Sequence, residues 1–158
     1  YDACLRDVSA TRHLTERSLQ IKREMIERDE FDQGPRKIFN YGHSFGHAIE
    51  SLTNYKVPHG IAVSLGMDMA NFVSIKMGLL EPRIRIEIRE LLKEIWRGYD
   101  IKDLDVKKFC GALAKDKKNV GSELRLILCK GYGQVFKAPV KNDMKLKNWI
   151  TEYFQNEL

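Results

Sequence analysis

The chain has 158 residues, of which 43% are hydrophobic and 31% charged, and this is enough to bury the core of one domain. No apolar run approaches the ~20 residues of a membrane span, and scattered cysteines (Cys4, Cys110 and Cys129) indicate thiols in a reducing compartment, so we expect a cytoplasmic protein. The net charge of +5 comes from basic residues mixed with acids along the chain, which argues against nucleic acid as a partner and favours a small anionic substrate.

Periodic apolar residues predict about six helices and one β-hairpin. The expected helices cover, in chain order, residues 1–28, 35–54, 59–80, 84–96, 106–113 and 146–154. The second has Asp32 as its expected N-cap and Pro35 in its first turn. The third is apolar around its whole circumference and is therefore expected to be central and buried. Alternation at 124–129 and a second run at 135–138 predict the hairpin, so the expected fold class is mainly α with a small hairpin near residues 123–139.

A polar stripe distinguishes residues 35–50 of the second predicted helix. On a helical projection, five polar residues fall within roughly 80° of one another: Arg36, Asn40, His43, His47 and Glu50. Apolar side chains fill much of the remaining surface, and the stripe lacks the lysines of an ordinary solvated face. Gly42 and Gly46 each lower helix propensity by roughly 1 kcal/mol, which makes sense where a backbone or a ligand approaches closely. The stripe therefore indicates a functional site.

Three of the four histidines, His43, His47 and His59, lie within seventeen residues of the chain. His43 and His59 can each offer a neutral imidazole to a divalent metal such as zinc, and a catalytic zinc keeps one coordination position open. Two histidines are too few for such a site, so His47 or Glu50 has to complete the set within this chain. The spacing does not match H-E-x-x-H and gives no support to a protease. The alternative role for His59 is that of a structural residue beside Pro58 at a helix N-terminus.

Basic residues near this stretch are candidate anion ligands, namely Lys22, Arg36 and the pair Lys117 and Lys118. Arginine binds carboxylate or phosphate bidentately, whereas lysine acts as a movable point charge. Arg36 is the strongest candidate because it shares the predicted histidine face. The lysines can equally be ordinary solvated side chains.

These residues together resemble the C-terminal domain of 3-dehydroquinate synthase. The similarity covers most of the chain and is densest between residues 22 and 70. It includes Lys22, Asp29, Glu30, Gly34, Arg36, the segment NYGHSFGHAIE at 40–50, His59, Gly60, Gly66 and Met67. The later segment that begins with Asp116, Lys117 and Lys118 is also similar. The most specific part is G-H-[ST]-x-G-H-A with the following H-G.

The resemblance implies an enzyme that cyclises a sugar phosphate. Members of the family bind NAD on an N-terminal α/β domain and zinc on a helical C-terminal domain. They convert 3-deoxy-D-arabino-heptulosonate 7-phosphate to 3-dehydroquinate with loss of phosphate, in the shikimate pathway. By the same resemblance, residues 1–158 are a single metal- and substrate-binding domain at the end of a longer chain that forms a homodimer. The NAD-binding domain is then missing, so these residues alone are expected to be inactive.

The resemblance also assigns roles around the metal. His43 and His59 correspond to ligands of zinc or of another divalent metal such as cobalt, and His47 corresponds to an acid–base or substrate-contacting residue. The family's third metal ligand is a glutamate well upstream of this helix, so it is expected before Tyr1. Glu50 is a weaker candidate for a ligand on this basis.

The resemblance also assigns substrate-binding residues, but it does not determine which sugar phosphate is the substrate. Lys22, Arg36 and Asn40 correspond to substrate ligands, and Lys117 and Lys118 to weaker ones. Ile61 stands where the family has a glutamate beside the metal. One alternative is therefore a related cyclase such as 2-epi-5-epi-valiolone or 2-deoxy-scyllo-inosose synthase, or more distantly a metal-dependent alcohol dehydrogenase. Another alternative is a non-catalytic helical module that binds a metal or a protein.

Overall fold

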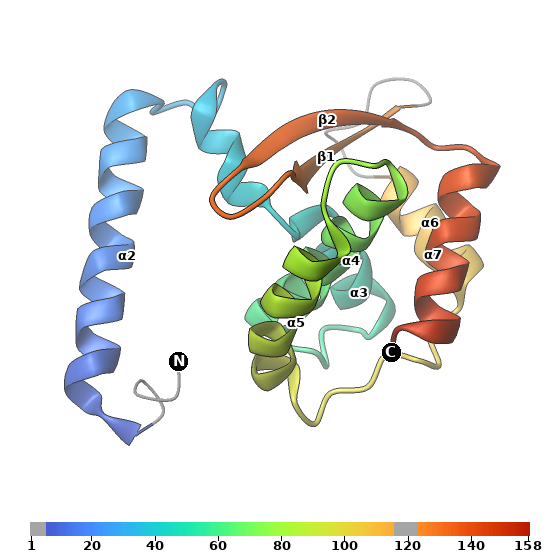
Figure 1. Ribbon diagram of the computed structural model, residues 1–158, viewed down its shortest axis with the longest axis horizontal. Helices are drawn as coiled ribbons and strands as arrows, with labels where there is room; N and C mark the ends of the chain where they lie inside the picture. Colours follow the sequence, from blue (N-terminus) through green and yellow to red (C-terminus); the bar gives the residue numbers. More distant parts are fainter. Residues whose placement is uncertain (1–5, 116–122) are drawn as a thin grey trace. The chain divides into compact units, whose positions relative to one another are not determined.

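The computed structural model describes residues 6–115 and 123–158, and the chain divides into two compact units, Tyr1–Phe39 and Asn40–Leu158. Within the described residues the fold is mainly helical with one hairpin, as the sequence predicted (Figure 1). None of the helices in these two ranges is both long and apolar enough to cross a membrane. The expectation of a single domain at the end of a longer chain stays a prediction.

The first unit is built on one long helix, α2 (Val8–Arg28). Asp7 caps the helix, because its side chain accepts a hydrogen bond from the Ser9 N–H at 2.8 Å. No residue of α2 is buried in the structure described, which distinguishes it from the helices of the second unit.

The loop after α2 is organised by Asp29, whereas the sequence had predicted Asp32 as the cap of the next helix. The Asp29 carboxylate accepts backbone hydrogen bonds from Gln33 at 2.9 Å, Gly34 at 2.8 Å and Arg36 at 3.0 Å. Desolvation opposes ionisation, but these three donors hold the pKa of Asp29 below its ordinary value. Asp32 lies in the turn with a left-handed φ of 53°, which is not the extended backbone of an N-cap.

The continuous helix predicted over residues 35–54 is wrong, because the structure breaks it at Gly42. A 3-10 helix, η1 (Pro35–Asn40), comes first, and α3 (His43–Leu52) begins after a turn. Gly42 has a left-handed φ of 78°, which a helix interior does not allow. The five residues of the predicted stripe are thus divided between two elements, Arg36 and Asn40 on η1 and His43, His47 and Glu50 on α3.

The second unit is arranged around α4 (His59–Lys76), and the prediction of a central, buried helix is confirmed (Figure 1). Eleven residues of α4 are buried, so almost every side of the helix meets another element. Its neighbours are α3, α5 (Pro82–Trp96), β1 (Glu123–Cys129) and α7 (Met144–Asn156). A further helix, α6 (Val106–Ala114), packs against α3 and α7.

Three glycines let α3 and α4 approach at backbone distance. A Cβ on Gly66 would lie 2.1 Å from the carbonyl oxygen of Gly42, and one on Gly42 would lie 2.5 Å from the carbonyl oxygen of Val63. At Gly46 a Cβ would lie 3.0 Å from the Val63 Cα. The expectation that Gly42 and Gly46 admit a close neighbour is therefore confirmed, and the neighbour is the backbone of α4. This contact places His59, at the start of α4, beside the histidines of α3.

β1 and β2 (Val135–Lys141) form the expected antiparallel hairpin, with Leu126 opposite Ala138. The second strand runs three residues further than the predicted end at 138. Leu126 and the two neighbouring leucines on its face, Leu124 and Leu128, are buried, so β1 closes one side of the core around α4.

A buried ionic network ties α7 to α4 and α5. Asp68 has no exposed surface and accepts two hydrogen bonds from Arg85, both at 2.9 Å, and one from the Tyr153 hydroxyl at 2.8 Å. The Nε of Arg89 lies 3.1 Å from Asp68 as an ion-pair contact without hydrogen-bond geometry. Glu157 pairs with Arg85 at 3.0 Å and with Arg89 at 2.8 Å. Each buried charge thus has an opposite charge, which compensates for its desolvation.

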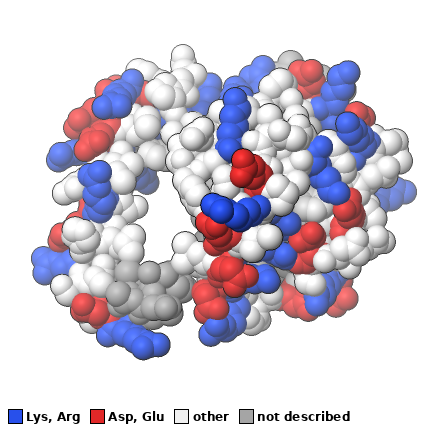
Figure 2. All heavy atoms as spheres, in the orientation of Figure 1, with Lys and Arg blue, Asp and Glu red and all other residues white. Residues whose placement is uncertain are grey.

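Charged side chains of both signs are interspersed on the face of the molecule in Figure 2. The excess of basic residues is therefore not gathered into one patch on that face. The expectation that the protein does not bind nucleic acid stays a prediction.

Candidate metal centre

Three imidazole rings come together where α3 meets the start of α4. The ring centroids of His43 and His59 lie 5.3 Å apart, those of His43 and His47 lie 5.5 Å apart, and those of His47 and His59 lie 6.0 Å apart. His43 and His47 share one face of α3 because they are four residues apart. His59 is the first residue of α4 and follows Pro58, which fixes the backbone entering the helix. The three histidines therefore form one cluster.

Glu50 adds a buried carboxylate to this cluster. It lies on α3 about one turn beyond His47, and its Oε1 is 3.0 Å from Nδ1 of His59. The Glu50 side chain is 10% exposed, whereas that of His59 is 57% exposed. One edge of the His59 ring is thus held by the protein, and the ring is still open to a ligand.

Tyr41 connects His43 to the core. The carbonyl oxygen of Tyr41 lies 3.2 Å from Nδ1 of His43, and the Tyr41 hydroxyl donates a hydrogen bond to Oδ1 of the buried Asn71 on α4. Burial is the main cause that raises the pKa of the Tyr41 hydroxyl, and the nearby Cys129 adds to it. The turn that precedes α3 is therefore anchored from both ends, at the histidine ring and in the core.

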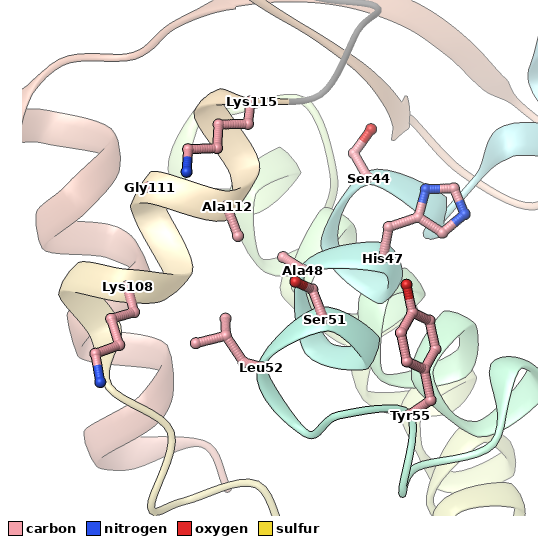
Figure 3. A pocket seen from close by; sticks show the side chains of 10 residues that line it. All are labelled: Ser44, His47, Ala48, Ser51, Leu52, Tyr55, Lys108, Gly111, Ala112 and Lys115. Carbon is pink, nitrogen blue, oxygen red and sulfur yellow. The ribbon is translucent and has the colours of Figure 1, made fainter.

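A groove of about 1000 Å³ opens between α3 and α6 (Figure 3). Its residues come from the α3 side (Ser44, His47, Ala48, Ser51, Leu52 and Tyr55) and from α6 (Lys108, Gly111, Ala112 and Lys115). Phe45 stacks on Phe109 with ring centroids 6.4 Å apart and holds the two helices together. The His47 ring lies on the side of α3 away from α6 in Figure 3, and His47 belongs both to the lining of the groove and to the histidine cluster. The space is large enough for a small molecule, and Lys108 and Lys115 line its α6 wall with amino groups that extend away from α3 in Figure 3.

The donor atoms of the cluster fit a divalent metal such as zinc or cobalt. His47, Glu50 and His59 each offer a ligand atom, and these atoms lie within 4.8 Å of one another. The ring of His43 lies closer to that of His59 than the ring of His47 does. Imidazole nitrogen and carboxylate oxygen are both ordinary zinc ligands. The distances between ligand atoms support the set His47, Glu50 and His59, and the ring distance brings His43 beside His59 as a further candidate.

The predicted substrate ligands are distributed over both units. Lys22 is an exposed side chain on α2, and Arg36 is half-buried on η1, so both belong to the first unit. Nη1 of Arg36 donates a hydrogen bond to the Glu30 carbonyl oxygen at 2.8 Å, which fixes the guanidinium in its loop. Asn40 is the first residue of the second unit. The remaining two, Lys117 and Lys118, lie outside the described residues.

Sequence reasoning missed Tyr41, Lys108 and Lys115 as residues of the site. Tyr41 acts through Asn71, which is thirty residues further along the chain, and no local pattern links the two. The two lysines of α6 have the spacing of an ordinary solvated helix face. Only the packing of α6 against α3 brings them to the groove.

Comparison with known proteins identifies relatives of this chain. Residues 2–119 match the family described as 3-dehydroquinate synthase C-terminal. A 3-dehydroquinate synthase of Campylobacter curvus is 41% identical over 133 residues, which cover 84% of this chain and 38% of that protein. One of Streptococcus pneumoniae is 37% identical over 140 residues, which cover 88% of this chain and 39% of that protein. The chain thus spans less than half the length of these relatives.

Solved structures of 2-deoxy-scyllo-inosose synthase share the fold. One, complexed with carbaglucose-6-phosphate, NAD+ and Co2+, has a TM-score of 0.68 at 27% identity and covers 77% of this chain and 35% of that chain. A second has a TM-score of 0.61 at 27% identity and covers 77% of this chain and 34% of that chain. The family match covers most of the chain and includes the whole histidine cluster, so this chain belongs to the 3-dehydroquinate synthase family and corresponds to its C-terminal domain.

Proposed function

We propose that this chain is the metal- and substrate-binding part of an enzyme of the 3-dehydroquinate synthase type. The complete enzyme cyclises 3-deoxy-D-arabino-heptulosonate 7-phosphate to 3-dehydroquinate with release of phosphate, and it acts as a homodimer in the cytoplasm. The observation that carries the proposal is the cluster of His43, His47 and His59 in a chain 41% identical to a 3-dehydroquinate synthase. The substrate is a small anion, and neither nucleic acid nor a membrane is involved.

His43 and His59 are the proposed metal ligands, and a glutamate from an upstream part of the complete protein is the third. When bound, the metal polarises the substrate oxygen at the carbon that gives hydride to NAD, and NAD is held mainly by the upstream domain. His47 moves a proton to or from the substrate, since histidine is the commonest acid–base residue. Its membership of both the cluster and the lining of the α3–α6 groove supports this role.

The anionic groups of the substrate are bound by charged and amide side chains. The proposed ligands are Lys22, Arg36 and Asn40, with weaker contributions from Lys117 and Lys118. An arginine suits a carboxylate or phosphate because its planar fork donates two parallel hydrogen bonds. Lys108 and Lys115 line the α6 wall of the groove that His47 also lines, and their positive charge supports an anionic ligand in this region.

A second candidate is a cyclase of the 2-deoxy-scyllo-inosose synthase type. Two observations favour it, namely the similar structure complexed with carbaglucose-6-phosphate and the identity of Ile61. Ile61 is half-buried two residues after His59 and packs against the core. An isoleucine cannot hydrogen-bond a substrate hydroxyl, so the polar contacts beside the metal differ from those of relatives with a glutamate at this position.

The test is phosphate release by the complete protein in the presence of NAD and Zn2+ or Co2+. We expect release from 3-deoxy-D-arabino-heptulosonate 7-phosphate that requires both the metal and NAD. The parallel assay uses glucose 6-phosphate, the sugar of which carbaglucose-6-phosphate is the carbocyclic analogue. Release from glucose 6-phosphate alone would favour the second candidate, and release from neither sugar by a metal-loaded protein would favour a non-catalytic module. The 158-residue chain by itself is expected to be inactive in both assays.

A further inference from the structure

Glu50 is the buried acid of the histidine cluster, and its environment differs from that of the three rings. The residue is 8% exposed and lies on α3 between the buried Ile49 and the exposed Ser51. A carboxylate in such a position is unfavourable unless a hydrogen bond compensates for its lost hydration. Nδ1 of His59, at 3.0 Å from Oε1, supplies that hydrogen bond.

The chemistry of the acceptor determines the tautomer of the ring. A carboxylate oxygen accepts the hydrogen bond, so Nδ1 of His59 carries the proton in this contact and, in the neutral ring, Nε2 carries the lone pair. The same argument applies to His43, because its Nδ1 lies 3.2 Å from the Tyr41 carbonyl oxygen, which is also only an acceptor. Both proposed metal ligands thus have Nδ1 directed at a protein oxygen, which favours the same tautomer in each ring, with the lone pair on Nε2.

We propose that Glu50 is a positioning residue of the metal centre, which holds His59 in the Nδ1–H tautomer and does not itself bind the metal. The inference rests on the metal site of the proposed function. Histidine ligands commonly donate their second ring N–H to a carboxylate or a carbonyl oxygen, which orients the ring and raises its basicity.

The competing role for Glu50 is that of a direct ligand, because its carboxylate, His47 and His59 offer atoms within 4.8 Å of one another. In that role the Glu50 carboxylate binds the metal and also accepts the hydrogen bond from Nδ1 of His59. His43 is then left out, although its ring is nearer to His59 than that of His47 is. The positioning role accounts for the contacts of His59 with Glu50 and of His43 with the Tyr41 carbonyl oxygen. It also makes ligands of the two rings that lie nearest to each other in the cluster, those of His43 and His59.

The two roles are distinguished by loading the complete protein with Co2+, whose visible absorption reports the number and kind of its ligands. The variants are Glu50→Ala and Glu50→Gln, and the matched control is Glu90→Gln, which changes an exposed carboxylate on α5. The dissociation constant for Co2+ is measured by competition with a chelator, and the spectrum is recorded at saturating Co2+. The melting temperature of each metal-free variant shows whether it is folded.

We expect Glu50→Ala to weaken Co2+ binding about 10- to 100-fold and to retain the wild-type spectrum at saturation. Glu50→Gln keeps an accepting oxygen and is expected to lose less affinity, and Glu90→Gln is expected to lose none. A changed spectrum in Glu50→Gln would overturn the proposal in favour of direct ligation, and this variant decides the question if Glu50→Ala does not fold. Wild-type affinity in a folded Glu50→Ala would overturn any role for Glu50. A wild-type protein that binds no Co2+ would instead refute the proposed metal site.

Discussion

The ionisation of Tyr41 and of Tyr153 is opposed by the fold. Burial is the main cause that raises the pKa of both hydroxyls, and the carboxylate of Asp68 adds to the shift at Tyr153. A tyrosine in the unfolded chain ionises near its ordinary pKa of 10.0, whereas these two keep their protons to higher pH when folded. Their stabilising contribution is thus complete below the unfolded pKa and is lost as the pH rises through the folded pKa.

The free energy of unfolding is therefore expected to fall at alkaline pH, by up to about 1.4 kcal/mol per pH unit for each tyrosine. Urea unfolding from about pH 9 to pH 11 measures this slope. Tyr41→Phe should make the slope shallower, because residue 41 then no longer contributes to the difference in bound protons between the folded and the unfolded state. Tyr99→Phe, at an exposed position, serves as the control. Equal slopes for the wild type and Tyr41→Phe would contradict the prediction.

At the level of single residues, the sequence was informative where the spacing is short and the chemistry is distinctive. His43, His47 and His59 stand out because metal-binding side chains recur within a few helical turns. The atoms that hydrogen-bond to these rings cannot be predicted from the spacing of residues along the chain. The Tyr41 carbonyl oxygen is a backbone atom, and the pairing of Glu50 with His59 depends on how closely α3 approaches α4.

The approach of α3 to α4 depends on Gly66, and replacing this glycine tests it. A Cβ on Gly66 would meet the carbonyl oxygen of Gly42 at 2.1 Å, and backbone atoms cannot turn aside as a flexible side chain can. We expect Gly66→Ala to lower the free energy of unfolding by about 1–3 kcal/mol or more through overpacking. Gly111→Ala on α6 is the control, since nothing lies within 4 Å of a Cβ there. Equal stability of the two variants in urea unfolding would show that the helices are not in backbone contact.

At the level of elements, regular apolar periodicity predicted the helices and the hairpin well. The exception is the helix expected over residues 35–54, because a projection at 100° per residue assumes an unbroken helix. Its low helix propensity alone makes Gly42 a cost to such a helix, but its left-handed φ of 78° goes further and separates η1 from α3. The N-cap assignment failed for a related reason, since the side chain of Asp29 reaches forward over several residues to organise the loop.

The charges around Asp68 connect three helices and make a prediction for the stability of the second unit. Asp68→Asn removes the fully buried charge that faces Arg85 and Arg89, so within this network the two arginines are left to share the carboxylate of Glu157. We expect the free energy of unfolding to fall by about 3–5 kcal/mol. The control is Glu16→Gln, which breaks an exposed pair with Arg12 and is expected to change stability by less than about 1 kcal/mol. Urea unfolding of both variants is the measurement, and a similar small effect in each would contradict this role of Asp68.

For the whole molecule, the resemblance carried by residues 22–70 was sufficient to identify the family, which the match over residues 2–119 confirms. The ionic network was not foreseen, because Asp68 meets Arg85 and Tyr153 only after three distant segments have packed together. The boundary between the two units was not foreseen either. It falls within η1, where no change in composition marks it.

The central claim is that His43 and His59 hold a catalytic metal while His47 transfers protons, and the metal content of three variants of the complete protein tests it most directly. We predict that His43→Ala and His59→Ala each lose the bound metal. His47→Ala should retain the metal and lose about 10²- to 10⁴-fold in rate. Loss of the metal from His47→Ala together with its retention in His43→Ala would contradict the claim and would assign the metal to His47, Glu50 and His59 instead.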